Sequence, residues 1–149
     1  MIQNRKKRTD HLLVHKIIDP FVHEIHLKDV LQIIIGSTIL AVPVGFTEET
    51  WRLGERLPWT NVIGILLLSI LFISIFIYYN YYRGKIKHHW DKFVERIIIT
   101  YLVAFIIVSV ILTLIDMAPW LTDIYLSLKR IIIVTLPSSM SAAIADMLK

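Results

Sequence analysis

The chain contains no cysteine among its 149 residues. This excludes disulfide bonds, thiolate metal sites and a cysteine nucleophile, and it leaves the redox compartment open. Charged residues are scarce, at 19% of the chain, and long segments hold none. No serine–histidine pair and no nucleotide-binding loop is evident, so we expect neither an enzyme nor a bound cofactor or metal.

Long apolar segments dominate the sequence instead. Residues 62–79 and 97–115 hold no charge, and residues 30–46 are broken only by glycine and proline. A helix needs roughly 20 apolar residues to cross a bilayer core of about 30 Å. Hydrophobic residues make up 56% of the chain and the mean hydropathy is +0.64. The sequence therefore predicts an all-α, polytopic membrane protein.

A fourth apolar segment, residues 121–148, is interrupted by Lys129 and Arg130. A lone cation near mid-bilayer costs at least ~2.5–3.5 kcal/mol. We therefore expect one continuous or kinked helix that turns both residues toward protein or water. The alternative is an interfacial helix over 121–128 followed by a span over 131–147. The prediction is a four-helix transmembrane domain, residues 30–149, with spans at about 30–46, 61–80, 96–115 and 120–147.

Residues 1–29 form a basic segment in which apolar and polar residues alternate at helical spacing. We expect interfacial helices on the inner leaflet, with basic flanks facing anionic lipid. The segment also carries His11, His15, His23 and His26. Their spacing would suit a two-histidine metal site or a pH sensor, but ordinary interfacial histidines are the expected interpretation.

Lysine and arginine are unevenly divided between the two sides of the predicted bundle. Six precede the first span and five lie between Arg83 and Arg96, whereas the loop after the first span has only Arg52 and Arg56. Loops rich in these residues stay in the cytoplasm. We therefore expect a multi-pass protein of the plasma membrane with both termini in the cytoplasm.

The segment that follows the first span is the most informative local feature. Pro43 and Gly45 should kink or stop the first helix, and Pro137 should do the same in the fourth. Thr47 is then placed to cap a new helix whose first turn holds Glu48 and Glu49. Arg52 follows Glu48 by four residues and is expected to pair with it.

One interpretation of these acids is purely structural: a capped outer helix whose acids pair with Arg52, Arg56, Lys129 or Arg130. Two functional hypotheses stand beside it. In the first, several copies surround an axis and Glu48 and Glu49 form a carboxylate ring at the outer mouth of a cation channel or ion-handling pore. Thr47 would cap the acid-bearing helix, and Arg52, Lys129 and Arg130 would supply counter-charges. In the second, the chain is a non-conducting membrane scaffold or sensor. Both hypotheses include self-association, and neither includes nucleic acid.

The run Pro43-Val44-Gly45-Phe46-Thr47-Glu48-Glu49-Thr50-Trp51 resembles a motif of an uncharacterised archaeal and bacterial family of small integral membrane proteins. That motif reads Pro-x-x-x-Thr-Glu-Glu-x-Trp and follows the first span. Residues 79–84 and 136–143 are also similar, so the resemblance touches most of the chain from residue 28 onward. It implies a small prokaryotic membrane protein and adds no activity.

Overall fold

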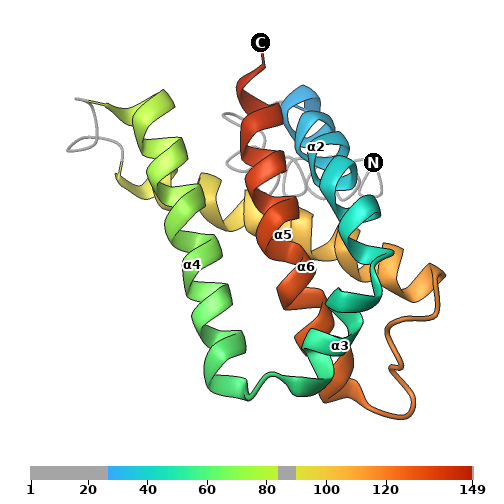
Figure 1. Cartoon of the computed structure of the whole chain (residues 1–149). Coiled ribbons are helices and arrows are strands. Elements are labelled where there is room, and N and C mark those ends of the chain that lie inside the picture. The colour runs from blue at the N-terminus through green and yellow to red at the C-terminus, as the bar shows by residue number, and fades with distance from the viewer. Residues whose placement is uncertain (1–26, 84–89, 149) are drawn as a thin grey trace, which may run out of the picture.

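The computed structural model describes residues 27–83 and 90–148, and every regular element in this part is helical. The elements are α2 (Leu27–Gly45), α3 (Glu48–Arg56), α4 (Trp59–Ile77), the π-helical turn η1 (Tyr78–Tyr82), α5 (Trp90–Leu114) and α6 (Ile124–Met147) (Figure 1). Four helices are long and apolar enough to cross a membrane: α2, α4 with η1, α5 and α6. The predicted all-α fold with four spans is confirmed. The predicted interfacial segment lies almost wholly outside the described residues.

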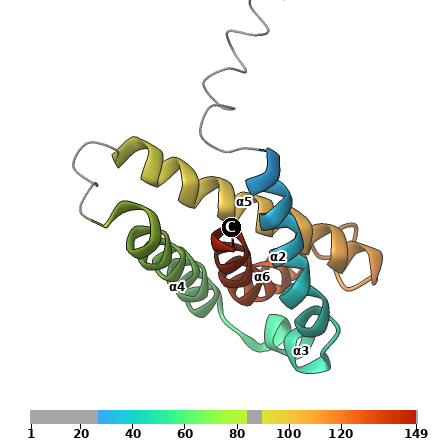
Figure 2. The ribbon, with the colours of Figure 1, turned by 90° about the horizontal axis from the view of Figure 1, so that it is seen from above.

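Helix α6 forms the centre of the bundle. Of its most apolar window 56% is buried, against 22–28% for the other three spans. Figure 2 shows α2, α4 and α5 arranged around α6, and α6 contacts all three as well as α3. The three outer helices direct large apolar side chains outward, as expected for surfaces that meet lipid or another copy.

The bundle has two ends that recur below. The start of α2 and the end of α6 lie at one of them, which we call the terminal end (Figure 1). The opposite end carries α3, and we call it the α3 end. Having both the start of the first span and the end of the last at one end agrees with an even number of spans. Which end faces the cytoplasm stays a prediction.

Small residues bring α2 and α6 close together. A Cβ atom placed on Gly36 would lie 2.4 Å from Ala145 Cβ and 2.8 Å from the Ser141 carbonyl oxygen. No side chain larger than hydrogen fits there without moving the backbone of α6. Close approach through small residues is a common way for helices to associate in lipid, where apolar burial gives little drive.

The two prolines do not break their helices. Pro43 lies inside α2, which ends only at Gly45, and Pro137 lies inside the unbroken α6. The end of α2 is closed by Phe46 N–H donating to Val42 O at 3.2 Å. Proline is tolerated within transmembrane helices because neighbouring helices and polar groups compensate for the lost hydrogen bond. The break predicted at Pro43–Gly45 is therefore located at Gly45.

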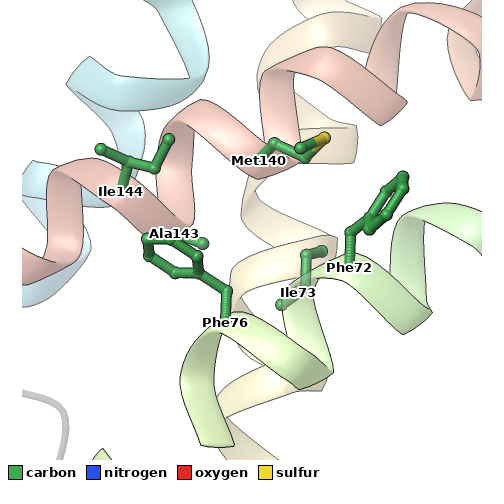
Figure 3. A pocket seen from close by; sticks show the side chains of 6 residues that line it. All are labelled: Phe72, Ile73, Phe76, Met140, Ala143 and Ile144. Atoms are coloured by element: carbon green, nitrogen blue, oxygen red, sulfur yellow. The ribbon is translucent and has the colours of Figure 1, made fainter. Parts of the chain in front are cut away.

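A small apolar pocket lies between α4 and α6 (Figure 3). Three residues of each helix line it: Phe72, Ile73 and Phe76 from α4, and Met140, Ala143 and Ile144 from α6. None of these side chains is charged or carries a hydrogen-bonding group. The lining of the pocket is therefore apolar throughout.

Candidate functional site

The turn into α3 is held by side-chain hydrogen bonds. Thr47 has the extended backbone (φ −89°, ψ 136°) of an N-cap residue, but its side chain does not bond a helix amide. Its hydroxyl instead donates to Val44 O at 2.8 Å and lies 2.7 Å from Thr50 Oγ1. The indole N–H of Trp51 donates to Gly45 O at 2.7 Å. Thr47 thus occupies the predicted position, and the turn uses its hydroxyl to stay folded.

Glu48 and Glu49 lie exposed in the first turn of α3. Glu48 Oε1 pairs with Arg52 Nη2 at 2.6 Å, and both side chains are more than half exposed. The predicted pair is confirmed, and at a surface it contributes only about 0.3–0.5 kcal/mol. Both carboxylates therefore stay accessible to ions in solution.

A third acid of α3, Glu55, anchors the helix to α6. Its Oε1 accepts from Arg130 Nη2 at 2.8 Å, and Arg130 is 8% exposed. Arg130 Nη1 also donates to Met117 O at 2.8 Å. The contact is close because Gly54 has no side chain: a Cβ there would lie 2.6 Å from Arg130 Cγ. The sequence analysis did not single out Glu55, although it lies in the same short helix as Glu48 and Glu49, one turn after Trp51.

Lys129 also turns toward protein. Its Nζ donates to Leu57 O at 2.8 Å and lies 5.5 Å from the ring centre of Trp59. Both cations contact protein groups, and they lie in one continuous helix, as predicted, with no break between residues 128 and 131. The contacts of the two cations go to Leu57, Met117 and Glu55. The structure does not bring them to Glu48 or Glu49.

A second group of charges, the terminal-end cluster, consists of Asp29, Tyr81, Arg96 and Asp146. Arg96 Nη2 lies 2.6 Å from Asp146 Oδ2 and 3.8 Å from Asp29 Oδ2. The Tyr81 hydroxyl donates to Asp146 O at 2.9 Å, and its ring centre is 3.9 Å from Arg96 Cζ. The cluster joins α2, η1, α5 and α6, so all four spans meet in it.

The sequence analysis missed this cluster because it placed Arg96 at the boundary between the basic loop and the third span. Helix α5 begins at Trp90, which puts Arg96 nearly two turns inside it. A signal was available in the sequence. Arg96 and Asp146 each lie at the end of an apolar segment, and both ends are predicted to face the same side of the membrane. Opposite charges at matching depth in a bundle are expected to pair, because a buried charge is costly alone.

The hypotheses about histidine fall outside the structure, since all six histidines lie in residues that it does not describe. Within residues 27–83 and 90–148, no group of three or more histidine, cysteine, aspartate or glutamate side chains is arranged to hold a metal ion.

Comparison with known proteins agrees with this architecture. The model of the family described as "Putative integral membrane protein (DUF2391)" matches residues 3–148, nearly the full chain. The chain belongs to this family. A search of the curated proteins found no match, and neither did a search of the solved structures. Membership agrees with the four apolar spans and establishes a multi-pass integral membrane protein.

Proposed function

We propose that this chain is the subunit of a homo-oligomeric cation channel, or ion-handling pore, with Glu48 and Glu49 at its outer mouth. The observation that carries the proposal is that the acids of α3 have different environments. Glu55 is tied to Arg130 at 2.8 Å, whereas Glu48 and Glu49 project from the same rigid helix and remain exposed. A ring of such carboxylates around a shared axis selects cations.

The path is proposed to run between subunits. The described centre of the bundle is filled by α6. Buried hydroxyls of this helix, such as those of Thr135 and Ser138, donate to its own backbone. These groups leave little to replace the hydration shell of an ion. The apolar outer faces of α2, α4 and α5 supply the contact surface that an oligomer needs.

In this proposal Lys129 and Arg130 act as positioning residues. They hold α3 and its C-cap residue through Glu55 and Leu57, so they fix the direction in which Glu48 and Glu49 project. Arg52, which pairs with Glu48 at 2.6 Å, is the counter-charge nearest the mouth. A cation entering the ring competes with Arg52 for that carboxylate.

The experiment is cation flux into liposomes that contain the purified protein. Replacing both acids, Glu48→Gln with Glu49→Gln, should lower K⁺ or Na⁺ flux about tenfold and weaken the preference for cations over chloride, because the ring loses its charge. Asp116→Asn is the matched control. Asp116 is also an exposed acid at the α3 end, and asparagine tolerates its φ of 59°.

Two results would contradict the proposal. If the double substitution leaves the flux unchanged, Glu48 and Glu49 do not form a cation-selecting ring. A folded, reconstituted protein that passes no ion at all favours the alternative, a non-conducting membrane scaffold or sensor.

A further inference from the structure

Three spanning helices each leave a buried oxygen atom without a hydrogen-bond partner, on a member of the terminal-end cluster or one helical turn from one. These atoms are Gln32 Oε1 on α2, Thr100 Oγ1 on α5 and Asp146 Oδ1 on α6. Gln32 lies one turn after Asp29, and Thr100 lies one turn after Arg96, so each shares a helix face with a member of the terminal-end cluster. A buried acceptor left without a hydrogen bond destabilises the fold, so three such atoms that flank one charge cluster point to an occupant.

The Asp146 carboxylate is bound on one side only. Its Oδ2 accepts from Arg96 Nη2 at 2.6 Å, from Arg96 Nε at 3.1 Å and from the Tyr81 hydroxyl at 3.3 Å. An arginine fork usually gives one N–H to each carboxylate oxygen. Here both go to Oδ2, and Oδ1 is left without a donor in a residue that is 1% exposed.

Thr100 differs from most of the serine and threonine hydroxyls in the described spans, and the hydroxyl of the neighbouring Tyr101 is also buried without a partner. Ser37, Ser69, Ser109 and Thr135, one from each spanning helix, all donate to the carbonyl four residues earlier. Thr100 is fully buried and makes no such bond to the Arg96 carbonyl. Its oxygen is therefore free to serve as a ligand.

Gln32 places a third oxygen where α2 meets the end of α6. Its Nε2 donates to Leu148 O at 2.8 Å, two residues beyond Asp146. That bond fixes the side-chain amide and leaves Oε1 as the free atom. Neither Gln32 Oε1 nor Asp146 Oδ1 can donate, so these two acceptors cannot satisfy each other.

We propose that these oxygens bind a monovalent metal cation, with Na⁺ the best fit, in each subunit. Carboxylate, amide and hydroxyl oxygens are the ligands of hard cations. A divalent ion usually takes several carboxylates, whereas the three free oxygens include one carboxylate oxygen and two neutral ones. The site lies at the opposite end from Glu48 and Glu49, so it is independent of the proposed mouth.

The test is thermal unfolding of the purified full-length protein in detergent, in NaCl, KCl or choline chloride at constant ionic strength. Binding to the folded state should raise the Tm saturably with Na⁺, by about 3 °C or more, over choline. Thr100→Val should abolish this increment and keep the Tm in choline close to that of the parent, because valine matches threonine in shape. Thr135→Val, which removes a buried hydroxyl that bonds its own helix, should keep the increment.

Two outcomes overturn the proposal. If Na⁺, K⁺ and choline give the same Tm, the oxygens hold water and bind no cation. If Thr100→Val and Thr135→Val both keep the Na⁺ increment, the ion binds elsewhere. Liposome flux is measured separately, so a failure here leaves the channel proposal standing, and the reverse also holds.

Discussion

At the scale of the residue, the charged side chains of this protein form two kinds of ion pair. Arg96 and Asp146 are buried and join helices, whereas Glu48 and Arg52 pair in the open. The environment decides the energetic weight of each pair. Breaking a buried pair leaves an uncompensated charge, while an exposed pair is screened by water.

This contrast gives a stability prediction. Asp146→Ala should lower the free energy of unfolding by about 3 kcal/mol, because it leaves Arg96 buried without its nearest carboxylate. Glu48→Ala should change it by less than about 0.5 kcal/mol. Equilibrium unfolding of the purified protein in detergent measures both. Equal effects of the two substitutions would show that the terminal-end cluster is not a structural ion pair.

The residue scale also marks the limit of the sequence. The pair of Glu48 and Arg52 was predictable because the two residues are one helical turn apart. Asp29, Arg96 and Asp146 come from three helices separated by dozens of residues, and a charge at the edge of an apolar run does not reveal which neighbour it will face. The partners of Lys129 and Arg130 were hidden for the same reason.

At the scale of the element, the length of each apolar segment predicted the spanning helices correctly. The sequence predicted the ends of these helices less accurately. The four helices predicted at about 30–46, 61–80, 96–115 and 120–147 are found at 27–45, 59–82, 90–114 and 124–147. Helix α5 starts six residues early because a charged first turn and a half extend the helix beyond the apolar run. Hydrophobicity alone does not register that extension.

The packing of α2 against α6 gives a prediction at this scale. Gly36→Ala should destabilise the bundle by about 1–3 kcal/mol, because the new methyl group overlaps Ala145 Cβ and the Ser141 carbonyl. Gly64→Ala is the matched control in α4, where nothing lies within 4 Å of the added Cβ. Alanine there should leave stability unchanged or raise it slightly. Thermal unfolding separates the two, and a tolerated Gly36→Ala would contradict the close contact.

At the scale of the whole molecule, the distribution of basic residues predicts a direction in the membrane that the fold alone does not determine. The terminal end should face the cytoplasm and the α3 end the outside. The lack of cysteine makes this simple to measure. A single cysteine at Thr122 should react with a membrane-impermeant maleimide on intact cells, and one at Lys28 only after permeabilisation. The opposite result would place Glu48 and Glu49 inside and move the proposed mouth to the cytoplasmic face.

The central place of α6 has a consequence for how the protein is made. Helix α6 leaves the ribosome after α2, α4 and α5, yet it is the helix that all three pack against. Until it inserts, Arg96 lacks Asp146, its nearest carboxylate, and the earlier helices are held only by their contacts with one another, such as those between α2 and α5. Biogenesis should therefore pass through a loose, protease-sensitive stage that ends abruptly when the final hairpin enters the bilayer.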